Sequence, residues 1–369
     1  VHFRAIRDAN VVLDNINNEA FSADFITKTT AEANFIRGYS YAELYYLFGA
    51  LPLYQSAEDD PLLGRSSDVE TTAFIEQELT AAVANLPEDA PFGRATRGAA
   101  QGILCKFYLN TKQWQRAADV AQQIISSGKY QLMDSYTDVF AIANEGNAEL
   151  LWALTKSSGS PTTAQAVNAL MFPPDYPRPF PNNGVFAART YVFDSFIDSF
   201  EPTDERLNFM VQDFVSSATG ETVQGYGNDQ TFPHKYEFDP QSAGFQAGND
   251  FPLVRYADIL LARAEALNEI SGPNQESIDL INQVRTRANA TPISLGDFGG
   301  QEVLRAAILQ ERGWEFYFEM KSREDYIRHG VFISNAQARG KNAQPHHVLF
   351  PIPQVEIDAN DALEQNPSY

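Results

Sequence analysis

Cysteine, histidine, basic residues and long apolar runs are all scarce in this sequence of 369 residues. Its one cysteine, Cys105, excludes an intrachain disulfide. No run of about 18 apolar residues occurs, so no segment predicts a membrane-spanning helix. Lysine and arginine total 27 against 48 aspartates and glutamates, which gives a net charge of −21. This imbalance argues against nucleic acid or anionic lipid as an electrostatic partner.

The composition is otherwise that of a globular protein, with 44% apolar and 20% charged residues. A chain of this length can bury a large core without disulfides. Aromatic residues make up 12% of the chain, so some of them must reach the surface or line a site. The sequence shows no signal peptide and begins abruptly at Val1, as if inside a helix. We therefore expect further chain upstream.

Motifs for catalysis and for cofactor binding are missing. The sequence contains no P-loop, no G-x-S-x-G, no H-E-x-x-H, no C-x-x-C and no EF-hand loop. The adjacent His346 and His347 would point to opposite faces of a strand, which favours a solvated or packing role over a metal site. Cys105 occupies a position in a helix pair that requires a small residue. We therefore expect no catalytic residue, no metal and no cofactor.

Acidic residues leave one enzymatic alternative open. A glycosidase needs two carboxyl groups roughly 5–10 Å apart, and the 48 acidic residues offer many such pairs. Glu311, Glu315 and Glu319 follow one another at a spacing of four, on one face of a predicted helix. We interpret them as ion-pair partners of their sequence neighbours Arg312, Lys321 and Arg323.

Apolar positions that repeat every three or four residues predict helices in the first 155 residues. A capping box at Ser67 and Glu70 marks the start of one of them. Residues 148–155 are apolar and short, and predict a strand. The predicted helices cover 31–48, 67–86, 97–110 and 115–127.

Residues 156–250 have a different character, because prolines and glycines interrupt them throughout. We expect ordered loops there, with one helix near 191–200, because aromatic residues are interleaved with the prolines. Helices resume over 254–270, 276–288 and 301–329. The spacing of Leu104, Cys105, Tyr108 and Ala117 matches a tetratricopeptide helix pair, in which small residues let two helices approach.

Several segments together resemble the SusD/RagB family of outer-membrane nutrient-binding lipoproteins. They occur in the family's order and cover most of the chain. The tail is the most specific of them. The segments are Phe3–Leu13 (FRAIRDANVVL), Arg37–Tyr39 with Phe48–Leu53 (RGY…FGALPL), Arg255–Leu261 with Ala264–Ala266 (RYADILL…AEA), Glu311–Glu319 (ERGWEFYFE), and Phe350–Asn360 with Gln365–Tyr369 (FPIPQVEIDAN…QNPSY).

The resemblance implies an all-α fold of tetratricopeptide-like helix pairs that carries a loop-rich ligand-binding region. Residues 1–369 would form a single SusD-like domain. Within it we expect helical repeats over 1–155, the ligand region over 156–250, further helical pairs over 251–330 and an extended segment over 331–369.

The resemblance also implies a role and a location. The protein would bind an oligosaccharide at the outer surface of the outer membrane, without catalysis, and deliver it to a SusC-like TonB-dependent transporter. Its only tie to the membrane would be an N-terminal lipid anchor that this sequence does not contain. Three alternatives stay open: a peptide ligand, a helical glycoside hydrolase, and a plain repeat scaffold for protein partners.

No ligand residue follows from the family motifs, so the predicted site is chosen from the residues themselves. Aromatic rings can cover the apolar face of a sugar, while arginine and asparagine bind its hydroxyl groups. Both kinds of side chain occur together in the proline-rich part of the middle region. The predicted ligand contacts are Tyr176, Arg178, Phe180, Asn182, Asn183 and Tyr226.

Overall fold

The computed structural model describes residues 1–160, 162–188 and 190–369. The chain divides into two compact units. The first contains Val1–Ile124 and Ser322–Tyr369, and the second contains Ile125–Lys321. The predicted all-α class is confirmed, because the described strands form only three short two-stranded sheets.

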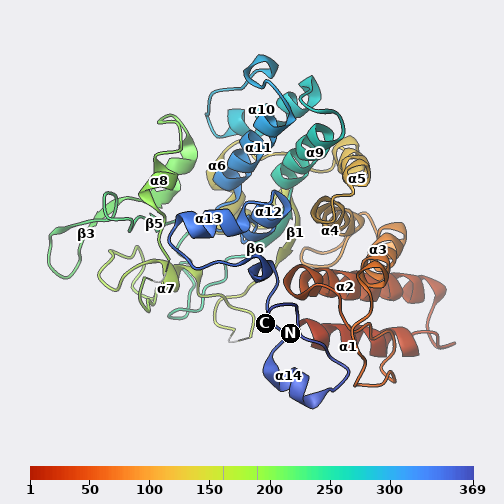
Figure 1. Ribbon diagram of the computed structural model, residues 1–369. Helices are drawn as coiled ribbons and strands as arrows, with labels where there is room; N and C mark the ends of the chain where they lie inside the picture. The colour runs from red at the N-terminus through yellow and green to blue at the C-terminus, as the bar shows by residue number, and fades with distance from the viewer. Residues whose placement is uncertain (161, 189) are drawn as a thin grey trace. The chain divides into compact units, whose positions relative to one another are not determined.

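The first unit is built from long helices near its start and short ones near its end. Figure 1 shows α1 and α2 running side by side, with α3 and α4 following. The long helices are α1 (His2–Asn15), α2 (Ala23–Phe48), α3 (Asp68–Asn85), α4 (Arg97–Asn110) and α5 (Trp114–Ser126), whose last residues belong to the second unit. The short ones are α12 (Ser322–Arg328), α13 (Phe332–Ala338), the 3₁₀ helix η4 (Pro345–Val348) and α14 (Gln354–Ala359).

Local signals explain where these helices begin. The capping box predicted at Ser67 is present, because its hydroxyl accepts from the Glu70 N–H and Glu70 accepts from the Ser67 N–H. α2 starts earlier than the predicted residue 31, because the Ser22 hydroxyl caps it by accepting from the Phe25 N–H at 3.2 Å. Cys105 is fully buried beside the Ala117 carbonyl, which confirms its packing role in the helix pair.

The extended segment predicted over 331–369 is wrong, because three short helices interrupt it. Proline stands at the start of two of them, where its fixed φ angle favours a helix and its missing N–H costs nothing. Pro345 opens η4 and Pro353 precedes α14. His346 and His347 therefore lie on one helical turn with ring centroids 4.2 Å apart, and not on opposite faces of a strand.

The second unit combines three longer helices with many short elements. The longer helices are α9 (Tyr256–Ser271), α10 (Gln275–Arg287) and α11 (Gln301–Phe316). The short helical elements are α6 (Tyr136–Phe140), η1 (Ile142–Asn144), α7 (Val167–Met171), α8 (Asp194–Ile197), η2 (Glu205–Phe209) and η3 (Leu295–Asp297). The strands are β1 (Leu150–Leu154), β2 (Met210–Val211), β3 (Asp213–Val215), β4 (Thr222–Gln224), β5 (Phe232–Pro233) and β6 (Phe251–Arg255).

The single helix predicted over 301–329 is broken at residues 317–321. Phe318 and Met320 adopt positive φ angles of 63° and 58° there, which ends the helix. The turn buries Glu319 and Lys321, while Met320 between them stays 82% exposed. The helix predicted near 191–200 is likewise shorter than expected, since only the four residues of α8 are helical.

The buried glutamates of α11 and of the turn that follows it bind cations from distant segments. The Arg255 guanidinium reaches Glu315 at 2.6 Å and Glu319 at 2.8 Å, and Arg206 reaches Glu311 at 2.7 Å. Ion pairing of these glutamates is thus confirmed, but the predicted partners are wrong, because Arg312 and Lys321 pair with Asp258. Arg323 binds backbone carbonyls. We call this the buried ionic cluster: Glu149, Asp204, Arg206, Lys235, Arg255, Arg285, Arg287, Glu311, Glu315 and Glu319.

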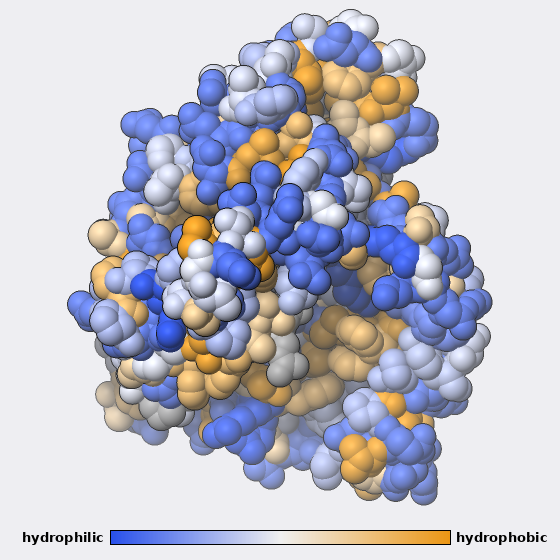
Figure 2. Space-filling view, turned by 90° about the vertical axis from the view of Figure 1, so that its left-hand side faces the viewer, coloured by the Kyte–Doolittle hydropathy of each residue, from blue (hydrophilic) through white to orange (hydrophobic). Residues whose placement is uncertain are grey.

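The loop-rich region is bracketed by one antiparallel strand pair. β1, the predicted strand, pairs with β6, so that Leu154 lies opposite Phe251. Between these strands, β2 pairs with β5 and β3 with β4. On the face drawn in Figure 2, apolar residues gather in the lower middle of the view, with hydrophilic residues around them. Among the helices of the described residues, none is both long and apolar enough to cross a membrane.

Candidate binding pocket

A pocket of about 530 Å³ in the second unit is the candidate functional site. This volume lies within the range of small-ligand sites. Five of its 13 lining residues are phenylalanine or tyrosine, and polar side chains stand among them. The lining residues, which we call the aromatic pocket, are Tyr136, Thr137, Phe140, Pro179, Phe180, Glu205, Asn208, Phe209, His234, Lys235, Glu237, Phe238 and Pro240.

Four segments far apart in the sequence supply this lining. α6 begins at Ser135, whose hydroxyl caps it by accepting from the Asp138 N–H. η2 begins at Asp204, whose carboxylate accepts from the Arg206 N–H at 3.0 Å. The other two segments are the stretch after β5 and the proline-rich loop. The His234 N–H donates to the Phe209 carbonyl at 2.7 Å and so joins two of the four segments.

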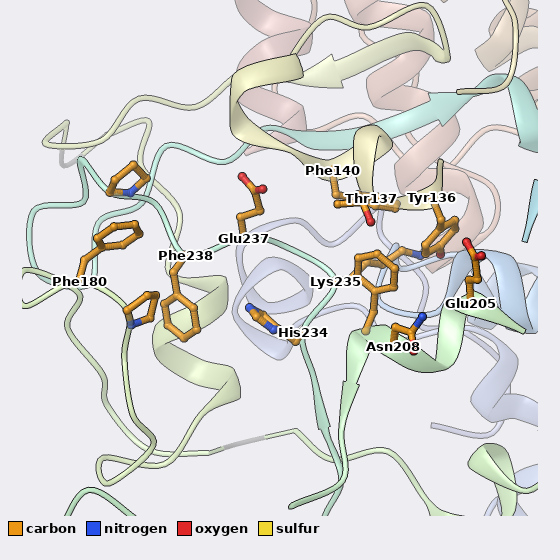
Figure 3. A pocket seen from close by; sticks show the side chains of 13 residues that line it. Tyr136, Thr137, Phe140, Phe180, Glu205, Asn208, His234, Lys235, Glu237 and Phe238 are labelled. Atoms are coloured by element: carbon orange, nitrogen blue, oxygen red, sulfur yellow. The ribbon is translucent and has the colours of Figure 1, made fainter. Parts of the chain in front are cut away.

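The pocket has two aromatic ends (Figure 3). Phe180 and Phe238 lie at one end, and Tyr136 lies at the other with Glu205 and Asn208 beside it. Glu237 and His234 lie between the ends. Phe238 belongs to a buried aromatic cluster, against which Phe180 packs. Tyr136 is only 1% exposed, so a ligand lying along the pocket would meet the ring of Phe180 at one end and carboxylates along its edge.

Lys235 is held beneath the pocket with every N–H engaged. Its ammonium donates to the carbonyls of Glu315 and Tyr317, each at 2.9 Å, and to the Glu319 carboxylate at 2.5 Å. It also lies 5.3 Å from the ring centroid of Tyr136. Burial lowers the pKa of Lys235 to about 7, because its removal from water outweighs the attraction of Glu319.

Burial also shifts the pKa values of His234 and Tyr136. The pKa of His234 is lowered by burial, and no partner in the described structure contacts its buried Nε2. Its ring makes edge contact with Phe172, with centroids 5.2 Å apart. The pKa of Tyr136 is raised well above its usual value by burial, and its hydroxyl donates to the Glu315 carbonyl at 2.8 Å.

The structure brings Phe180 into this pocket and places three other predicted residues in the adjoining loop. Asn182 donates to the Pro240 carbonyl at 3.0 Å, and Asn183 donates to the Asp239 carbonyl at 2.8 Å. Arg178 donates to the carbonyl of Asn183 at 2.6 Å. These bonds hold the loop against residues 239–242. None of the three side chains is among the lining residues.

The two predicted tyrosines lie outside the lining. Tyr176 stacks on Phe172 with centroids 4.2 Å apart and contacts Phe214 edge-on. Those contacts match a loop-anchoring role. Tyr226 is 37% exposed, and its hydroxyl donates to Asp198 at 2.7 Å. The structure does not bring Tyr226 together with Phe180 in the aromatic pocket.

Sequence reasoning did not select most of the pocket. Tyr136 and Phe140 occur in a short helix, and Phe209 and Phe238 are scattered among buried positions, so no spacing connects them. The available signal was aromatic enrichment beside proline and glycine, which did identify Phe180. The same signal marked Phe245, whose exposed ring lies against the exposed ring of Phe186 with centroids 4.5 Å apart.

Known proteins of one family match this chain. The model of the SusD family matches residues 186–369. A second SusD-like model, described as starch-binding and associating with the outer membrane, matches residues 1–109. The chain therefore belongs to the SusD family, as its sequence motifs indicated.

Individual relatives agree over nearly the whole chain. SusD-like protein P25 of Formosa agariphila is 29% identical over 98% of this chain and 76% of its own length. The starch-binding protein SusD of Bacteroides thetaiotaomicron is 24% identical over 92% and 72%. The surface glycan-binding protein A of B. thetaiotaomicron, solved in complex with laminarihexaose, shares the fold with a TM-score of 0.83 and 20% identity, over 99% of this chain and 84% of that one.

Proposed function

We propose that this protein binds oligosaccharides in the aromatic pocket without transforming them. The observation that carries the proposal is one pocket that combines aromatic lining residues, Phe180 among them, with exposed polar groups along its edge. A sugar ring has an apolar face of C–H groups and an edge of hydroxyls. Aromatic rings complement the face, while carboxylates and amides complement the hydroxyls. Family membership and the starch- and laminarihexaose-binding relatives support the same class of ligand.

The six predicted contacts take different parts in this proposal. Phe180 is the direct stacking platform, because it alone among them lines the pocket. Arg178, Asn182 and Asn183 hold its loop, and Tyr176 anchors that loop to the buried aromatic cluster. Tyr226 stays a predicted contact only for a ligand that extends beyond the pocket.

Paired measurements of affinity and melting temperature test these roles. Phe180→Ala should weaken glycan binding about five- to thirtyfold, equivalent to about 1–2 kcal/mol, with a smaller drop in melting temperature than Tyr176→Ala gives. Tyr176→Ala should lower the melting temperature, because it removes a packed ring. Phe193→Ala, which removes a 47% exposed ring outside the pocket, is the control. Full affinity in Phe180→Ala would place the ligand elsewhere.

A glycoside hydrolase is the second candidate, because Glu205 and Glu237 line the same pocket. Binding is favoured over hydrolysis since both side chains are exposed, whereas the general acid of a glycosidase is usually kept protonated by an apolar surrounding. A reducing-end assay with purified protein separates the two. Sugar release that disappears in Glu205→Gln or Glu237→Gln would identify the protein as a hydrolase.

The family also supports a partner and a location for the bound glycan. We propose that the protein is lipid-anchored at the outer surface of the outer membrane and passes its ligand to a SusC-like TonB-dependent transporter. Co-purification of the full-length protein from native membranes tests this. Recovery of the protein without a transporter, under conditions that keep other lipoprotein–transporter pairs intact, would count against it.

A further inference from the structure

The charges that line the aromatic pocket do not balance. Two of the 13 lining residues, Glu205 and Glu237, are acidic and exposed. The possible cations among the 13 are Lys235 and His234. Whether a negatively charged ligand finds a counter-ion in the pocket therefore depends on whether Lys235 or His234 can offer it a positive charge.

Lys235 has no N–H left for a ligand. An ammonium group carries three N–H donors, and here they meet two carbonyls and one carboxylate. The side chain is only 2% exposed. A carboxylate or sulfate in the pocket would have to displace these internal bonds, and Glu319 would then lose its own contact with the ammonium.

His234 offers no positive charge near neutral pH. Burial lowers its pKa, so the neutral imidazole is favoured. Arg178 belongs to the proline-rich loop that supplies Pro179 and Phe180, and one of its guanidinium nitrogens donates to the Asn183 carbonyl. Arg178 does not line the pocket. The pocket thus presents carboxylates to its ligand without an available cation.

We propose that the aromatic pocket selects oligosaccharides that carry no negative charge. This inference rests on the glycan-binding function proposed above and narrows its substrate class. The carboxylates of Glu205 and Glu237 accept hydrogen bonds from sugar hydroxyls, and such charge-assisted bonds are stronger than neutral ones. A uronic acid or a sulfate ester places like charges side by side and finds no counter-ion. Anionic polysaccharides are therefore rejected.

Matched probes test the proposal on the full chain. Calorimetry compares a neutral gluco-oligosaccharide of six units with an oligosaccharide of the same length that carries glucuronic acid or sulfate. The neutral probe should bind at least about tenfold more tightly at low salt, because two carboxylates repel the charged probe. The difference should shrink as salt is raised.

Charge-removing variants show whether these two carboxylates cause the selection. The double variant Glu205→Gln, Glu237→Gln should bind the anionic probe several-fold more tightly than the wild type does. It should bind the neutral probe equally or more weakly. Glu221→Gln removes one negative charge from an exposed residue outside the pocket and should leave the selectivity unchanged.

The outcomes separate this inference from the function on which it rests. Equal or tighter binding of the anionic probe by the wild type would overturn the charge selection and leave glycan binding intact. Loss of that anionic binding in Arg178→Gln would identify the cation responsible. Preferred binding of a basic peptide would overturn the glycan class itself. Binding of neither oligosaccharide would refute both proposals.

Discussion

Helices α4 and α11 both bury part of their surface, but α11 buries charged side chains beside its apolar ones, whereas α4 buries only uncharged residues. α4 buries Ala99, Ala100, Ile103 and Leu104 in the first unit, all at most 4% exposed. α11 in the second unit buries Glu311 and Glu315 at 1% and 0% exposure. α4 is stabilised by removal of apolar surface from water. α11 is held by charges that must stay matched, because one unpaired buried charge costs more than a lost apolar contact.

The largest expected effect comes from breaking the buried ionic cluster. Glu315 contacts Arg206, Arg255 and Arg287, so Glu315→Gln removes one carboxylate that three buried cations share and leaves a net positive charge in the cluster uncompensated. We expect a loss of about 3–5 kcal/mol in the free energy of unfolding, measured by urea denaturation.

Glu302→Gln on the same helix is the matched control, because Glu302 is exposed and should give no measurable change. A Glu315→Gln protein as stable as the wild type would show that the cluster contributes nothing net to the fold.

Truncation of a buried apolar side chain should destabilise the protein by nearly as much. This loss of stability should not depend on charge. Leu260 in α9 is fully buried, so Leu260→Ala should lower the free energy of unfolding by about 2–5 kcal/mol through lost burial and a residual cavity. Ile270→Ala removes a 44% exposed side chain from the same helix and serves as its control. An unchanged urea midpoint for Leu260→Ala would mean that this face of α9 is not packed.

Low pH should destabilise the charged core around Glu315 more than the apolar core around α4. Burial alone would raise the pKa of Glu315, but Arg287, Arg255 and Arg206 lower it to about 2. Its contribution to stability is thus present above the ordinary glutamate pKa of about 4.5 and is lost as pH falls toward 2. The urea midpoint of the wild type should drop between about pH 5 and pH 3. A Glu315→Gln protein should show a shallower drop in the same series.

The smallest expected effect is a contribution to stability that decreases as pH rises, opposite to that of Glu315. Burial, and the nearby Asp250 and Asp239, raise the pKa of Glu145 to about 7 despite the hydrogen bond it accepts from the Asp250 N–H. A raised carboxyl pKa stabilises the fold at low pH, and this stability is lost as pH rises from about 4.5 through 7. Glu145→Gln should therefore flatten the stability profile in that window. An identical slope in the variant would assign the pH dependence to another group.

The contrast between apolar and charged burial also explains which features the sequence could predict. α4, α9 and α10 were located to within about two residues, because their apolar positions repeat at helical spacing and caps mark their ends. The partners of Glu315 could not be located, since Arg206, Arg255 and Arg287 lie 28 to 109 residues away. Local spacing carries no information about such distant contacts.

The pocket was difficult to predict for a related reason. Phe180 stood out beside prolines, but Tyr136, Asn208 and Glu237 come from three other segments that only the tertiary fold brings together. Asn182 and Asn183 were expected to bind a ligand, yet their amide groups bind backbone carbonyls. A loop of irregular backbone needs such partners for its own carbonyls, and composition alone does not distinguish the two uses.

The pairing of β1 with β6 lets the exposed loops of the loop-rich region vary in length. Leu154 and Phe251 lie opposite each other, so residues 155–250 leave and rejoin the helical framework at adjacent points. The entropic cost of closing such an excursion grows only by about 0.6 kcal/mol for each doubling of its length. Insertions and deletions in its exposed loops can therefore accumulate without moving the ends that α9 depends on, whereas Arg206 and Lys235 must stay paired with the buried glutamates. The helical scaffold would then stay the same while the exposed loops change their sequence and length. Ligand specificity could diversify in this way, as it does in the loops of antibody domains.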